Sequence, residues 1–243
     1  MLHKYPKDYQ RINIKSHMYF SIAYQLLSKN IDNFESLNKN DMFIVDDYNH
    51  SLYKDYHVII VFSAMAIEAF LNDYLAVCFS DDVYYDNFDK LNVMQKIEVM
   101  FSVIWEDYFD KSKSLYNYLH DLLKIRNSFV HSKSNKLDDG WLRKNSKEIS
   151  VIDCTDGQSF EEAEIKKSLT EIIEWFQNSF NAIKAFYLLC QAVDEHDNNR
   201  NAIATQLSCM SSKEHFYINQ KVEDVNKKIK VFESKINNLK KLY

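Results

Sequence analysis

Glycine and proline are nearly absent from this chain, and their absence limits the folds open to it. The 243 residues include two glycines and one proline. Sheets joined by tight turns need many residues that accept a positive or a fixed φ angle. The sequence therefore predicts long helices with few sharp corners. Gly140 and Gly157 both fall within residues 134–160, which we expect to form an irregular insertion.

Apolar residues that recur every three or four positions predict where the helices lie. A first helix is expected at 14–29, and an Asn/Asp-rich connection follows to about residue 53. Further helices are predicted at 54–79, 89–107, 112–133 and 161–193. The fold class is all-α: an antiparallel helical bundle with a short irregular or β-hairpin insertion and an additional C-terminal amphipathic helix. Within the insertion, Ile149 to Ile152 is the candidate strand.

The chain divides into three parts on this reading. Residues 1–53 hold the N-terminal helix and the connection, 54–193 the bundle, and 194–243 a C-terminal amphipathic helix. Apolar residues in this last part alternate spacings of four and three, which is a coiled-coil seam. The sequence leaves open whether the seam binds a partner or packs on its own bundle. Its members are Ile218, Val222, Val225, Ile229, Phe232, Ile236 and Leu239.

Net charge and cysteine usage limit the kinds of binding site and the cellular compartment that we expect. A net charge of −5 argues against a chain that holds nucleic acid by a generally basic surface. Its four cysteines are far apart and show no C-x-x-C spacing, which predicts neither a zinc site nor a disulfide framework and favours the cytoplasm. The longest apolar stretch, residues 57–80, is interrupted by Glu68, Asn72 and Asp73, so no membrane span is expected.

Arg126 occupies an unusual position on the predicted helix 112–133. At 100° per residue it lies near the middle of the apolar arc. A buried guanidinium is costly unless an anion or several acceptors meet it. Asn127 and His131 share an adjoining face, one turn apart, and His120 lies on the same edge. The arc consists of Leu115, Leu119, Leu122, Phe129 and Val130.

Glu68 is a second anomaly, because it lies among apolar residues of the predicted helix 54–79. We expect Glu68 and Arg126 to face each other across the bundle, with Asn72 completing a polar network. If Glu68 is its partner, Arg126→Ala should lower stability by a few kcal/mol, because a buried carboxylate would be left alone. A structural salt bridge with no catalytic role would produce the same sequence pattern.

Three segments together resemble the HEPN domain family. They are SAMAIEAFLNDYL (63–75), QKIEVM (95–100) and LLKIRNSFVH (122–131). The family's hallmark is an Arg, four to six residues and then a His near the end of a core helix, which Arg126 and His131 match. A polar residue commonly follows the Arg, as Asn127 does here. The resemblance covers roughly residues 54–190.

The resemblance implies a metal-independent endoribonuclease, acting as a toxin or antiviral effector, with its site at a homodimer interface and no cofactor. Arg126 would clamp the scissile phosphate, His131 would act as general acid or base, and Asn127 would orient the imidazole or phosphate. Glu68, Asn72 and His120 would support them. Some members carry a tyrosine two residues after the His, where a partner antitoxin modifies them. This chain has Lys133 there, a candidate for substrate binding.

The alternative is a non-catalytic interaction protein, in which the bundle dimerises and the C-terminal helix recruits a partner protein or antitoxin. A nucleotide-binding bundle is a weaker alternative, because the sequence has no Gly-rich phosphate loop. His50 and His57 are interpreted as surface residues. The sixteen Tyr and sixteen Phe are interpreted as core and interface, although some could stack on bases.

Overall fold

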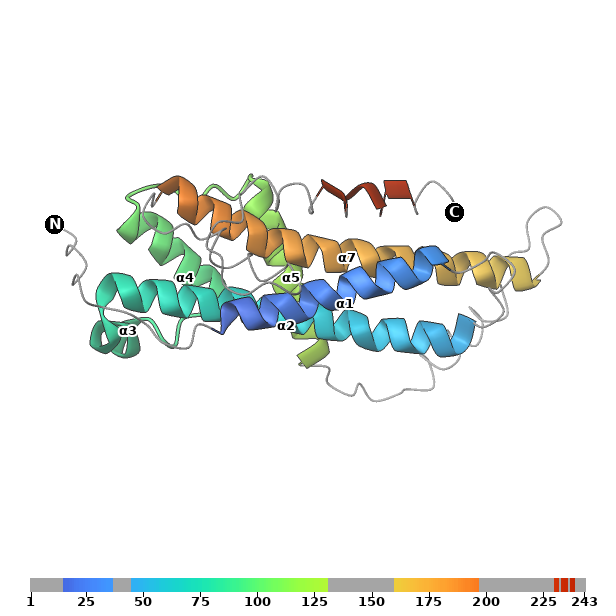
Figure 1. Ribbon diagram of the computed structural model, residues 1–243. Helices are drawn as coiled ribbons and strands as arrows, with labels where there is room; N and C mark the ends of the chain where they lie inside the picture. Colours follow the sequence, from blue (N-terminus) through green and yellow to red (C-terminus); the bar gives the residue numbers. More distant parts are fainter. Residues whose placement is uncertain are drawn as a thin grey trace, which may run out of the picture.

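The computed structural model describes residues 15–36, 45–130 and 160–196, and seven residues between 230 and 238. Within these ranges the protein contains helices and no strand, which confirms the all-α prediction. In chain order the elements are α1 (Ser16–Ser36), α2 (Val45–Phe79), α3 (Asp81–Asn87), α4 (Val93–Val99), the π-helix η2 (Met100–Ile104), α5 (Ser114–Val130) and α7 (Phe160–His196) (Figure 1).

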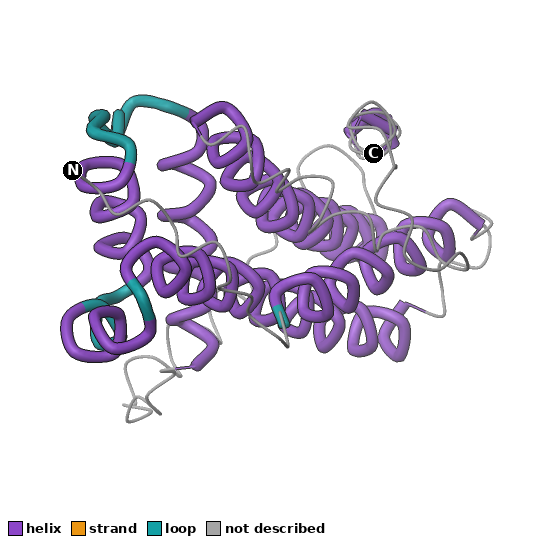
Figure 2. The backbone as a smooth tube through the Cα atoms, turned by 60° about the vertical axis from the view of Figure 1, so that its left-hand side comes forward, coloured by secondary structure: helices purple, strands orange, loops and turns teal. Residues whose placement is uncertain are grey.

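Helix α2 lies at the centre of the bundle. It packs against α1, α5 and α7 along its length, and α3 and α4 cover its C-terminal end. The three longest helices, α1, α2 and α7, run lengthwise through the molecule, as both views show (Figures 1 and 2). On α1 the buried residues recur at spacings of three and four, which is why one side of this helix joins the core. These residues are Phe20, Ala23, Leu27 and Ile31.

The apolar character of α2 follows from this central place. Residues Ser51–Phe79 are long and apolar enough to cross a membrane by length and composition alone, with a mean hydropathy of 1.7 in their most apolar 18-residue window. In the bundle, 56% of the most apolar window is buried against neighbouring helices. A helix covered on several sides needs apolar residues around most of its circumference, so its core position accounts for the composition.

The predicted connection before residue 54 is wrong in its last part, because α2 begins at Val45. The predicted domain boundary at 53 and 54 therefore falls inside a helix. Leu52 and Tyr56 are buried, and both lie beside Trp175 and Phe176 of α7. Burial of these side chains compensates for the weak helix propensity of the preceding Asp and Asn residues.

The helix predicted at 89–107 is shorter in the structure, where α4 and η2 form one run over residues 93–104. It begins after Asn92, whose side chain accepts from the backbone N–H of Gln95 at 3.0 Å. The Gln95 side chain accepts in return from the Asn92 N–H at 3.0 Å, which completes a capping box. After η2 the helix ends at Trp105, and Glu106 adopts a φ of 53°. The first helix is longer than predicted and ends at Ser36.

Two predictions lie outside the described residues. The insertion at 134–160, with its candidate strand, falls almost wholly within 131–159, which the structure does not describe. The same holds for the N-terminal part of the predicted seam. Where the C-terminal segment is described, between residues 230 and 238, it is helical.

Candidate functional site

Arg126 on α5 faces Glu68 on α2, as predicted from the helix faces. Its Nη2 atom lies 3.9 Å from Glu68 Oε2, and its Nη1 donates to Asn127 Oδ1 at 3.0 Å. The expected burial is wrong, because the Arg126 and Glu68 side chains are 29% and 42% exposed. The reason is local: among the described residues, α2 packs on Phe129 but leaves the last apolar residue of the arc, Val130, 54% exposed.

This arrangement leaves most of the guanidinium available. A separation of 3.9 Å is too long for a hydrogen bond, so Glu68 balances charge without engaging an N–H group closely. Arginine carries five N–H donors in a planar fork. Among the described residues, the one donor bond from its side chain is the bond to Asn127. Arg126 can therefore present paired donors to a further anion.

Asn72 does not join Arg126. Its Oδ1 accepts a hydrogen bond from Lys96 Nζ at 2.8 Å, and the same ammonium donates to the Tyr84 hydroxyl at 3.3 Å. Lys96 is 1% exposed. Burial lowers the pKa of Lys96, and the carboxylates of Glu68 and Asp89 oppose that change.

Lys96 was missed from the sequence, although a signal was present. It lies between Val93 and Met100 at spacings of three and four, on the side of α4 and η2 that enters the core. A lysine on an apolar stripe is the same kind of anomaly that marked Arg126. Glu68 thus lies near two cations: Arg126, whose Nη2 is 3.9 Å from Glu68 Oε2, and Lys96, whose pKa the Glu68 carboxylate raises. We call Glu68, Asn72, Tyr84, Lys96 and Arg126 the Glu68 cluster.

The predicted histidines are placed differently. His120 is exposed, with Nδ1 at 3.5 Å from Asp121 Oδ1 and its ring 5.9 Å from Tyr116. It has no contact with Arg126 among the described side chains. His131 and Lys133 lie outside the described residues, so their positions relative to Arg126 stay predictions.

His57 of α2 lies beside α5, the helix that carries Arg126. The sequence did not predict this contact. The His57 ring centroid is 3.8 Å from that of Phe129 on α5 and 4.2 Å from that of Tyr53. Its Nδ1 is 2.7 Å from the Tyr53 carbonyl oxygen. Because a carbonyl only accepts, this bond assigns a proton to Nδ1. No sequence signal marks this contact, because it depends on where α2 and α5 cross.

Aromatic rings from three helices meet at this end of α5. Trp175 of α7 lies 5.3 Å from Tyr53 and 6.1 Å from Tyr56, centroid to centroid, and Tyr56 lies 5.5 Å from Phe129. Tyr53 is 45% exposed, whereas Tyr56 is buried. We call Tyr53, Tyr56, His57, Phe129 and Trp175 the aromatic cluster. Its member on α5, Phe129, lies two residues after Asn127.

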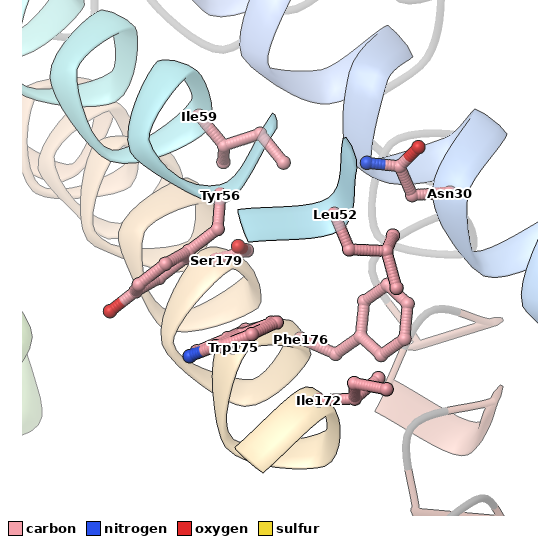
Figure 3. A pocket seen from close by; sticks show the side chains of 8 residues that line it. All are labelled: Asn30, Leu52, Tyr56, Ile59, Ile172, Trp175, Phe176 and Ser179. Atoms are coloured by element: carbon pink, nitrogen blue, oxygen red, sulfur yellow. The ribbon is translucent and has the colours of Figure 1, made fainter. Parts of the chain in front are cut away.

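A small cavity lies under the aromatic cluster, between α1, α2 and α7 (Figure 3). Its volume is about 10 Å³, which is room for about one water molecule. The cavity is too small to hold a nucleotide. Its lining consists of Asn30, Leu52, Tyr56, Ile59, Ile172, Trp175, Phe176 and Ser179.

Comparisons with family models, with curated proteins and with solved structures find no match for this chain.

Proposed function

We propose that this protein is a metal-independent endoribonuclease of HEPN type, acting in the cytoplasm as a toxin or antiviral effector. The observation that carries the proposal is the state of Arg126. It lies partly exposed near the C-terminal end of α5, bound to Asn127 and held loosely by Glu68 at 3.9 Å. Its remaining N–H donors have no hydrogen-bond partner within the described part of the chain, and such a guanidinium suits a phosphodiester.

The proposed reaction needs a proton acceptor and a proton donor. The 2′-oxygen of the ribose attacks phosphorus as its proton passes to the imidazole of one His131. The bond from phosphorus to the 5′-oxygen breaks, and that oxygen takes a proton from the imidazolium of a second His131. The products are a 2′,3′-cyclic phosphate and a 5′-hydroxyl. Arg126 offsets the charge that develops on the non-bridging oxygens.

A homodimer would bring the two histidines together. The open apolar end of α5 supports this part of the proposal, since Val130 is 54% exposed and Phe129 is partly exposed next to the motif. Exposed apolar side chains beside a polar motif suit a subunit interface. The aromatic cluster suggests the substrate class: its exposed Tyr53 offers a face on which an unpaired base can stack.

The test is cleavage of RNA by the purified protein in the presence of a chelator. We expect 2′,3′-cyclic phosphate ends from the parent chain, and a loss of about 100-fold or more for Arg126→Ala and for His131→Ala. Lys90→Ala is the matched control, because Lys90 is an exposed cation in the turn between α3 and α4, outside the Glu68 cluster. Cleavage that persists in both variants would contradict the proposal.

The second candidate function is a non-catalytic interaction protein. The observation that favours it is that Arg126 already has partners in its own chain, as a structural salt bridge would. In that case the parent leaves structured and unstructured RNA intact, and the open end of α5 serves only as a protein interface.

A further inference from the structure

The C-terminal segment contacts two helices of the bundle. Lys184 Nζ on α7 donates to Glu233 Oε1 at 3.1 Å, and Lys235 Nζ donates to Asp32 Oδ1 on α1 at 2.6 Å. Both contacts are ion pairs. Figure 1 shows the segment in dark red beside α7. Two residues that are two positions apart therefore bind two different helices.

The positions of these charges in the heptad pattern are informative. When Phe232 is taken as position d and Ile236 as position a, Glu233 is position e and Lys235 is position g. Residues at e and g flank the seam and select the partner by charge in coiled coils. Here the acidic e residue meets a lysine and the basic g residue meets an aspartate. Both flanks are thus complementary to the bundle.

Exposure of the described side chains agrees with one side turned to the bundle. Lys235 is half-buried, whereas Val231 is 48% exposed. The remaining described residues of the segment are exposed: Lys230, Glu233, Ser234, Asn237 and Asn238.

Lys184 is an anchored partner rather than a free surface lysine. Its side chain is 22% exposed, and its ammonium lies 5.5 Å from the Tyr118 ring centroid and 5.7 Å from that of Phe180. Burial lowers the pKa of Lys184, but the hydrogen bond to Glu233 and the nearby Tyr118 outweigh it and raise the pKa. A partly desolvated charge held by neighbouring rings loses less freedom on pairing than an exposed one.

We infer that α1 and α7 form a docking surface for an amphipathic helix, and that its occupant is the C-terminal segment of the same chain. Asp32 and Lys184 recognise a basic and an acidic residue on the two flanks of the docking helix. The bundle takes the place of a second coiled-coil strand. A partner helix that binds the seam must therefore compete with Asp32 and Lys184. This inference does not depend on the nuclease activity.

Hydrogen–deuterium exchange on the full-length chain tests the docking. Amides of residues 230–238 exchange slowly while the helix is held. We expect Lys235→Glu to raise their exchange rates roughly fivefold or more, because two carboxylates then face each other. Adding Asp32→Lys to Lys235→Glu restores the parent rates. The second pair allows the same swap, with Glu233→Lys and Lys184→Glu.

Lys230→Glu is the matched control. This variant reverses a charge on the same segment, but Lys230 has no ion pair among the described residues. The amides of residues 230–238 should therefore exchange at parent rates in this variant. Amides of α2 report in every variant that the bundle is intact. Unprotected amides in the parent, or swaps that fail to restore protection, overturn the inference. Protection that falls on dilution also overturns it, because the occupant is then the segment of a second copy.

Discussion

The ion pair between Arg126 and Glu68 contributes little to stability in this geometry. Its members are 29% and 42% exposed and 3.9 Å apart, so water screens both charges. We expect Arg126→Ala to change the free energy of unfolding by less than about 1 kcal/mol, not by the few kcal/mol that a buried pair would imply. Urea denaturation of the parent and the variant measures the difference.

This prediction separates a functional arginine from a structural one. A large loss of cleavage with little loss of stability is the result expected of a residue that binds substrate. A loss of about 3 kcal/mol or more would instead mean that the pair holds the bundle together. Glu68→Gln is the companion variant, since it removes the carboxylate charge and keeps the side-chain shape.

The buried lysine Lys96 gives a prediction about how stability depends on pH. Burial places its pKa below the ordinary value of 10.5 in the folded protein. The unfolded chain therefore holds the proton more tightly, and stability attributable to Lys96 rises as the pH increases through the folded pKa toward 10.5. Relative to Lys96→Met, the parent should gain stability as the pH rises toward 10.5. Denaturation curves at several pH values measure this gain, and Lys90→Met is the exposed control.

At the residue scale, the sequence predicted correctly that Arg126 faces Glu68, but it predicted wrongly that the two side chains are buried. The period of 3.6 residues fixes which residues share a side of a helix, so the approach of Arg126 to Glu68 was predictable. Exposure depends on which other helix covers that side, and no period contains this information. The contact of His57 with Phe129 has the same origin, because it depends on the crossing of α2 and α5.

The end of α7 is held by a contact with the loop after η2. The His196 ring stacks on Trp105 with centroids 4.2 Å apart and planes at 10°, and its Nε2 lies 3.1 Å from Asp107 Oδ2. Trp105 Nε1 in turn donates to the Tyr74 hydroxyl of α2 at 2.9 Å. Three elements far apart in the sequence are thereby joined.

Acid should weaken this contact. The hydrogen bond with His196, followed by that from the Tyr108 backbone N–H, lowers the pKa of Asp107 below its ordinary value of 3.8. The stabilisation from Asp107 is therefore present above that value and is lost as the pH falls through the lower folded pKa. We expect Asp107→Asn to reduce the loss of stability as the pH falls below 3.8. Thermal unfolding across that range measures it; equal slopes for parent and variant would contradict the assignment.

Helix boundaries are predicted wrongly where tertiary contacts or helix caps determine them. Asp and Asn near residue 47 predicted a loop, but α2 extends through them because Leu52 and Tyr56 are buried against α7. The start of α4 was readable, since Asn92 and Gln95 have the spacing of a capping box. The apolar period continues upstream across this cap, which is why periodicity alone predicts an earlier start at 89.

At the scale of the whole molecule, the proposed site requires two chains. One chain carries a single Arg126 and a single His131, and the proposed reaction uses two imidazoles. Light scattering at micromolar concentration should therefore give the mass of a dimer or a larger species. A strictly monomeric protein that still cleaves RNA would rule out the composite site.

Subunit mixing tests whether the two copies act together. When parent chains exchange at equal concentration with His131→Ala chains, random pairing leaves about a quarter of all dimers with two intact motifs. Before mixing, half of all dimers are parental, so cleavage should fall to about half if one site needs both imidazoles. If each chain carries a complete site, cleavage stays constant. Mixing with Lys90→Ala chains controls for exchange itself, and native mass spectrometry verifies that mixed dimers form. Because the total amount of parent chain never changes, a fall in rate has to come from pairing.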